Sequence, residues 1–123
     1  MPAPVRVANV AKPIAARFGL NQCRPCATAL REAFMRSGLH GYVARLATLG
    51  GRGNIVMRDP NFRLPFIIPP GEHSIATSGQ HFGAVVQEHV FDNIFREGIL
   101  LADWQAQFDC DVHHFTISKI ESF

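Results

Sequence analysis

A chain of 123 residues is long enough to bury one hydrophobic core and too short for two, so we treat residues 1–123 as a single domain. Its 12 basic and 10 acidic residues leave a net charge of only +2, and no cluster of Lys and Arg alternates with aromatic residues, which argues against nucleic acid as a partner. No apolar run approaches the roughly 20 residues that cross a bilayer, and the N-terminus lacks the layout of a signal peptide, so no membrane partner is expected. Three cysteines is an odd number, so at least one thiol lies outside any disulfide framework, which favours chemistry over cross-linking.

The first twelve residues carry two prolines among Val and Ala. We expect residues 1–12 to form a flexible arm or the end of a linker. A helix is predicted within residues 21–38, because Pro25 is tolerated only in the first turn of a helix and Gly38 supplies a stop. Its apolar positions recur every fourth residue and give the helix one face for a core: Cys26, Leu30 and Phe34.

Cys23 lies at the N-terminal tip of this predicted helix. Free backbone N–H groups and the positive end of the helix dipole lower the pKa of a thiol at such a position. A thiolate there is the nucleophile arrangement of cysteine hydrolases, provided that a histidine reaches it. Cys26, in contrast, falls in line with the apolar face and is expected to be a buried hydrophobe. From the helix alone, a purely structural role for Cys23 is an equal alternative.

The rest of the chain has the pattern of short strands separated by turns. We predict one hairpin from residues 42–49 and 54–57, joined by the glycine-rich residues 50–53, and an irregular connection over the proline-containing residues 58–71. A second hairpin follows, with strands at 81–86 and 89–93, then a short helix within 100–108 and a closing strand at 114–120. A helix followed by antiparallel strands predicts an α+β fold with the N-terminal helix packed on a small antiparallel sheet.

His81 begins the first strand of the second predicted hairpin, and Asp92 and Asn93 end its return strand. In a hairpin with a tight turn, one of these two residues lies beside His81 and accepts its ring N–H. That contact fixes the imidazole tautomer and stabilises the imidazolium. Cys23, His81 and either Asp92 or Asn93 are therefore candidates for nucleophile, base and orienting residue. Trp104 is expected to be a core residue.

Several short motifs occur in order: Gln-Cys-x-x-Cys-Ala at 22–27, Gly-Leu-x-Gly at 38–41, Ser-Gly-x-His-x-Gly at 78–83 and Val-Phe-Asp-Asn at 90–93, followed by Gly98 and Trp104. Over about residues 18–108 this ordered set resembles the small papain-fold toxin domains at the C-termini of bacterial polymorphic toxins. The resemblance implies a papain-like cysteine-hydrolase core with Cys23 as nucleophile, His81 as base and Asn93 or Asp92 as orienting residue. It also implies cysteine-protease-like hydrolysis inside a competing cell, with a dedicated immunity protein as partner.

The chain also departs from papain, where the reactive cysteine is the second of its Cys-x-x-Cys pair and a glutamine six positions earlier helps to form the oxyanion hole. Gln22 is adjacent to Cys23, so that role does not transfer directly. We expect the backbone N–H of Cys23 and a neighbour such as Gln22 to stabilise the oxyanion. Cys26 stays open as the alternative nucleophile.

The chemistry predicted is proton transfer from Cys23 to His81, attack of the thiolate on an amide or thioester carbonyl, and release of the acyl group to water or another acceptor. The same machinery serves proteases, deamidases and acyl or amide transferases. We expect a protein substrate in the cytoplasm of a recipient cell, reached by a secreted or delivered effector, and neither a cofactor nor a catalytic metal.

A zinc site is the main competing hypothesis. Cys23-x-x-Cys26 and Cys110-x-x-His113 together offer four ligands that suit structural zinc. A gap of 83 residues separates the two halves, and Cys-x-x-Cys in zinc knuckles is more often held in a turn than in a helix. The remaining alternative is a binding or structural domain without catalysis, in which these residues serve the core and the turns.

Overall fold

The computed structural model describes residues 2–68 and 74–123. Within these residues the helices and strands follow one another in an order that begins with helices and continues mostly with strands. They are α1 (Val5–Ala15), α2 (Cys23–Arg36), β1 (Tyr42–Thr48), β2 (Ile55–Met57), β3 (Ser74–Ala76), β4 (Gln80–Val86), β5 (His89–Phe91), β6 (Ile99–Leu100), α3 (Leu101–Trp104), β7 (Phe108–Asp109) and β8 (Phe115–Ser122).

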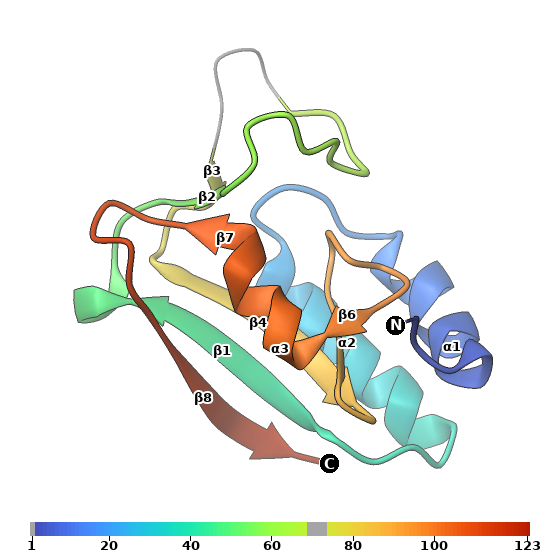
Figure 1. Ribbon diagram of the computed structural model, residues 1–123. Coiled ribbons are helices and arrows are strands. Elements are labelled where there is room, and N and C mark those ends of the chain that lie inside the picture. The colour runs from blue at the N-terminus through green and yellow to red at the C-terminus, as the bar shows by residue number, and fades with distance from the viewer. Residues whose placement is uncertain (1, 69–73) are drawn as a thin grey trace.

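The strands form two sheets, one of five strands in the order β6-β5-β4-β1-β8 and one of three in the order β3-β2-β7. All of the strand pairs in these sheets are antiparallel. Helices α1 and α2 lie on one face of the five-stranded sheet, and α3 lies on the other (Figure 1). The predicted α+β class, with the helix that starts at Cys23 packed on an antiparallel sheet, is what the structure has.

Helix α2 begins and ends where Pro25 and Gly38 predict. Gly38 has a φ of +73°, which glycine adopts without steric cost, and the chain turns out of the helix there. The backbone N–H of Leu39 donates to the carbonyl of Phe34 at 2.9 Å, and that of Gly38 donates to Met35 at 3.0 Å. These two hydrogen bonds are the Schellman pattern, and the buried side chains of Leu39 and Phe34 share one core cluster.

Alternation along β4 divides its side chains between the two faces of the sheet. Ala84 and Val86 lie in the cluster that contains Leu30 of α2. Val85 lies in the other cluster, with Trp104 of α3. The central strand therefore contributes to two separate cores. Its even-numbered residues face α2, and its odd-numbered residues face α3.

The flexible arm expected at residues 1–12 is not present, because residues 5–15 form helix α1. Its buried positions are spaced four apart, at Val7, Ala11 and Ala15, and they pack in the same cluster as α2. Pro4 takes the N-cap position, where the missing N–H of proline costs nothing. The sequence gives little sign of this helix, because two of its three buried residues are alanine and because Pro13 lies inside it.

The hairpin expected from residues 42–49 and 54–57 is also wrong. Strand β1 pairs with β4 and β8, whereas β2 pairs with β3 and β7 in the other sheet. Gly50, Gly51 and Gly53 all have positive φ angles. These glycines carry the chain from one sheet to the other instead of reversing it within one sheet.

Residues 58–71 were expected to form an irregular connection. Residues 58–68 contain no helix or strand, as expected, and residues 69–71 lie outside the described residues. Phe62, Leu64 and Phe66 are half-buried against the core cluster that contains Trp104. Ile67, in contrast, is 98% exposed and takes no part in this packing. None of the helices in the described part of the chain is both long and apolar enough to cross a membrane.

Two valines of α1 give a direct test of its docking. Val7 is 1% exposed and Val5 is 75% exposed, so Val7→Ala removes buried methyl groups and Val5→Ala removes solvated ones. We expect Val7→Ala to lower the free energy of unfolding by about 2 kcal/mol and Val5→Ala by less than about 0.5 kcal/mol. Urea unfolding measures both, and equal effects from the two variants would mean that α1 is not docked.

Candidate functional site

The thiol of Cys23 lies against an edge of β4 that β5 leaves uncovered. Strand β5 pairs only with residues 84–86 of β4, so the backbone groups of Gln80 and Phe82 on that side have no strand partner there. The Sγ atom of Cys23 is 4.0 Å from the carbonyl oxygen of Gln80, and the backbone N–H of Phe82 hydrogen-bonds to the sulfur. The first residue of α2 is thereby placed beside the start of β4, and 6% of Cys23 is exposed.

His81 and Asp92 form a completely buried pair. Nε2 of His81 is 2.8 Å from Oδ2 of Asp92, and both residues are 0% exposed. Asp92 holds Nε2, which leaves Nδ1 for the side of the ring that interacts with the Cys23 thiol. Nδ1 is buried and has no close hydrogen-bond partner among the described residues, which leaves it available to the thiol. The imidazole is therefore held by the carboxylate through one nitrogen and interacts with the thiol on its other side.

The pleat of the hairpin separates Asp92 from Asn93. Ala84 pairs with Phe91, so continuing the register brings Asp92 level with Gly83, on the same face as His81. Asn93 falls on the opposite face, where its Nδ2 donates to the carbonyl of Gly19 at 2.8 Å. Of the two residues that the sequence left open, the structure brings Asp92 to His81 and places Asn93 against the segment that leads into α2.

Asp92 accepts four hydrogen bonds. Oδ2 accepts from His81 and from Nε1 of Trp104, the latter at 2.9 Å, and Oδ1 accepts from the backbone N–H groups of Ile94 at 2.9 Å and Phe95 at 2.5 Å. The buried carboxylate is thus fully satisfied. Trp104 was predicted only as a core residue, although a completely buried indole needs an acceptor for its N–H, and that need was the available signal.

The three ionisable groups shift one another's pKa. Burial disfavours the thiolate of Cys23, but the hydrogen bond and positive charge of His81 and the N–H of Phe82 outweigh it and lower the thiol pKa. Burial likewise disfavours the imidazolium, but hydrogen bonds to Asp92 and Cys23 and their negative charges raise the pKa of His81 to about 9. Burial opposes ionisation of Asp92 too, but His81 and the N–H donors keep its pKa below the ordinary value. The charged forms of all three groups are favoured together.

Cys26 differs from Cys23 in every relevant respect. It is 0% exposed, and burial followed by the negative charges of Asp92 and Cys23 raises its pKa to about 12. A buried, protonated thiol is a poor nucleophile. These properties disfavour Cys26 as the alternative nucleophile.

The four-ligand zinc site does not form in the described part of the chain, where no group of three or more His, Cys, Asp or Glu side chains is arranged to hold a metal ion. The Sγ atom of Cys110 donates to the carbonyl of His114 at 3.4 Å. Nδ1 of His113 lies 2.7 Å from a carboxylate oxygen of Asp109. Both halves of the second motif are therefore engaged locally.

Gln22 occupies the N-cap position of α2 but makes no side-chain hydrogen bond to the first turn. Its Oε1 instead accepts from the backbone N–H of Gly19 at 2.7 Å. The first backbone N–H that bonds within the helix is that of Cys26, to the carbonyl of Gln22. The N–H of Cys23 precedes it and is one of the orphan donors of the helix start.

Arg96 fastens the loop that carries Asp92 to two other segments. Its Nε donates to the carbonyl of Asn93 at 3.1 Å, Nη1 to Pro65 at 3.2 Å and Nη2 to Phe18 at 2.9 Å.

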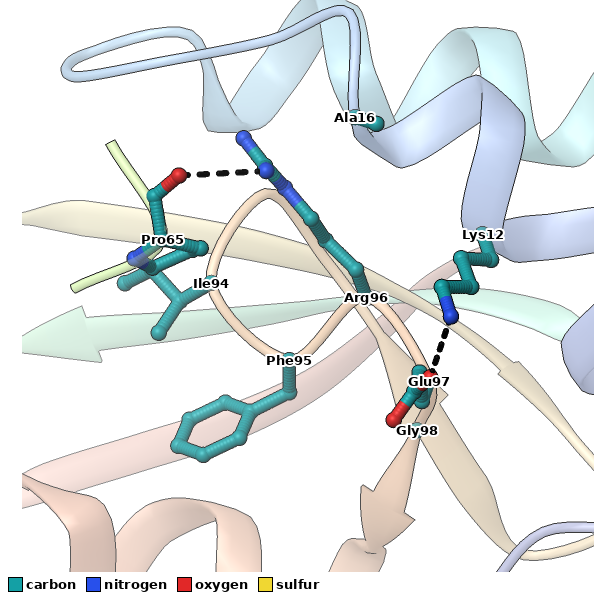
Figure 2. A pocket seen from close by; sticks show the side chains of 8 residues that line it. All are labelled: Lys12, Ala16, Pro65, Ile94, Phe95, Arg96, Glu97 and Gly98. Carbon is teal, nitrogen blue, oxygen red and sulfur yellow. Dashed lines mark hydrogen bonds and ion pairs between the residues drawn. The ribbon is translucent and has the colours of Figure 1, made fainter. Parts of the chain in front are cut away.

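Figure 2 shows Arg96 reaching Pro65 beside a cavity of about 410 Å³. That cavity is lined by neither Cys23 nor His81, so its size does not make it the reaction site. Its lining is Lys12, Ala16, Pro65, Ile94, Phe95, Arg96, Glu97 and Gly98.

A cysteine at the start of a helix, facing a histidine on an adjoining antiparallel sheet, is typical of proteins with a papain-like fold. The model of the papain fold toxin 2 family matches residues 7–109, and the chain belongs to this family. The family resemblance predicted over about residues 18–108 is confirmed, and the match begins inside α1. This is therefore a toxin domain with a papain-like fold. Among the curated proteins and the solved structures, none gives a significant match.

Replacing Trp104 by Phe tests the hydrogen bond that it donates to Asp92. We expect the loss of this bond to lower the free energy of unfolding by about 1–3 kcal/mol at neutral pH. Asp92 has a lowered pKa, so its contribution to stability is present above 3.8 and is lost as the pH falls through its folded value. The loss of unfolding free energy caused by Trp104→Phe should therefore be smaller in acid, as measured by urea unfolding between pH 7 and pH 3.

Ile75→Val is the matched control, because Ile75 is buried in the same cluster as Trp104 and is purely apolar. Its smaller deficit should be the same at both pH values. A deficit of Trp104→Phe that does not depend on pH would show that only packing was lost.

Proposed function

We propose that this domain is a papain-like cysteine hydrolase that cleaves a protein substrate and acts as an antagonistic toxin of bacteria. Cys23 is the nucleophile, His81 the general base and acid, and Asp92 the orienting residue. The observation that carries the proposal is the buried group of thiol, imidazole and carboxylate, in which the pKa of the thiol is lowered and that of the imidazole raised. Perturbed pKa values of this kind, produced by specific partners, mark functional sites.

The reaction begins with the Cys23 thiolate and the His81 imidazolium. The thiolate attacks the carbonyl carbon of the substrate, and the negative charge moves to the carbonyl oxygen, which the backbone N–H of Cys23 and the side chain of Gln22 stabilise. His81 gives its proton to the leaving nitrogen as the C–N bond breaks, which leaves a thioester on Cys23. His81 then takes a proton from water, the hydroxyl attacks the thioester, and the acid product leaves with the thiolate restored.

Asp92 keeps the imidazole in one orientation throughout these steps. Its Oδ2 accepts a hydrogen bond from the Nε2–H group, so Nδ1 is the ring nitrogen that exchanges protons with the thiol and the leaving group. The carboxylate also stabilises the imidazolium electrostatically. Asn93 supports the site indirectly, because its hydrogen bond to Gly19 anchors the segment that precedes the nucleophile.

The toxin family supports two further parts of the proposal. The domain is delivered as an effector and acts in the cytoplasm of a recipient cell, where its substrate is found. A cognate immunity protein protects the producing cell. A partner that inhibits such an enzyme would act most directly by covering the small exposed part of Cys23.

Expression of the domain in the bacterial cytoplasm tests the nucleophile. Cys23→Ala should abolish both growth inhibition and labelling by a thiol-directed activity probe, because the proposed acyl group is carried on the sulfur of Cys23. Cys26→Ala is the matched control, one helical turn away, and should keep both. The proposal is wrong if Cys26 is the residue that toxicity requires.

The dependence of alkylation on pH tests the thiolate–imidazolium pair. Cys23 should react with iodoacetamide at pH values below its ordinary pKa of 9.0, because His81 lowers the pKa of the thiol. In His81→Ala the imidazole no longer lowers the pKa of Cys23, and burial raises that pKa. The alkylation rate at pH 7 should therefore fall at least about tenfold, and the rate should begin to rise only at higher pH. Peptide mapping by mass spectrometry identifies the modified cysteine.

His114→Ala provides the control, since His114 is exposed and His81 is buried. This variant should alkylate like the unmodified domain at every pH. Identical pH profiles for His81→Ala and His114→Ala would contradict the ion pair.

A further inference from the structure

A small pocket adjoins the thiol on the side of α2 that faces β8. Cys23 packs in a cluster with Ala27, Val43 and Phe82, and the same three residues form part of the wall of the pocket. The pocket has a volume of about 50 Å³, enough for the polar end of one side chain. Its lining is Arg24, Ala27, Thr28, Arg31, Val43, Phe82, Ile120 and Glu121.

Positive charge predominates around this pocket. The guanidinium of Arg24 lies over the ring of Phe82, 4.8 Å from its centroid, and this cation–π contact holds it at the pocket wall. Arg31 also lines the pocket and forms an ion pair with Glu121. Two arginines and a single carboxylate therefore line the cavity, and the carboxylate is paired with one of the two.

A third arginine lies on the same face of the sheet. Arg45 of β1 is directly opposite Phe82 of β4, so both side chains project toward α2. Its Nε is buried and has no hydrogen-bond partner in the described part of the chain. Arg45 is not part of the pocket wall, but its positive charge adds to the potential on this face of the sheet.

We propose that this pocket binds an acidic side chain of the protein substrate, close to the bond that Cys23 attacks. The inference rests on the proposed hydrolase function and adds the substrate class to it. A carboxylate suits the site because the planar guanidinium donates paired N–H groups that match its two oxygens. Because Ala27, Val43 and Phe82 belong both to the pocket wall and to the cluster around Cys23, the acidic residue lies close to the scissile bond, and probes that carry it before the electrophile test this.

Peptidyl fluoromethyl ketones test the pocket directly. Three probes differ only in the two residues before the electrophile, which are both Glu, both Gln or both Lys. Because Arg24 is exposed, we expect the Glu probe to modify Cys23 only about fivefold faster than the Gln probe. The Lys probe should be the slowest, and intact-protein mass spectrometry follows all three rates.

Charge reversal at Arg24 separates the pocket from general electrostatics. In Arg24→Glu the preference for the Glu probe should disappear and the Lys probe should overtake it. Arg36→Glu makes the same change of charge in the last turn of the same helix, about 18 Å away at 1.5 Å per residue, and should leave the order of the probes unchanged.

The outcomes distinguish this inference from the function on which it rests. Equal rates with the Glu and Gln probes, or a Glu preference that survives Arg24→Glu, would overturn the acidic pocket even if Cys23 still alkylates in a manner that depends on His81. Ordinary alkylation of Cys23 by iodoacetamide, independent of His81, would overturn the hydrolase function and the pocket with it.

Discussion

The buried carboxylate of Asp92 is the constraint on which the arrangement of this domain depends. A charge removed from water costs several kcal/mol unless hydrogen bonds replace its hydration. Here the donors come from β4, from the end of α3 and from the loop that follows β5. Satisfying one side chain therefore ties three segments together, and the same set of bonds leaves the imidazole of His81 with one nitrogen directed toward the thiol.

Much of the site could be predicted from local signals, but the choice between Asp92 and Asn93 as the partner of His81 could not. Pro25 and Gly38 fix the limits of α2 through their own backbone preferences, so the position of Cys23 at the helix start followed from the sequence. The choice between Asp92 and Asn93 depends on the register of β4 against β5. A shift of one residue would exchange their faces, and no spacing in the sequence specifies that register.

The two wrong predictions about the fold also depend on contacts between distant parts of the chain. Helix α1 is stabilised by the alanines and the valine of one face packing against α2, and such small side chains give little signal before their partner is known. The glycines at 50–53 are compatible with a tight turn and with a passage between sheets. The pairing of β1 with β4 on one side and β8 on the other, both later in the chain, decides between these two uses.

The small exposed fraction of Cys23 has a consequence for the durability of the protein. A cysteine with a lowered pKa is ordinarily the first sulfur that peroxide converts to sulfenic acid, and the further oxidation steps cannot be reversed by thiols. Only 6% of this residue meets solvent, and the imidazole beside it is completely covered. The packing that prepares the sulfur for reaction therefore also narrows the approach to it, so that outside a reducing cytoplasm oxidation should be slower than the lowered pKa alone would produce.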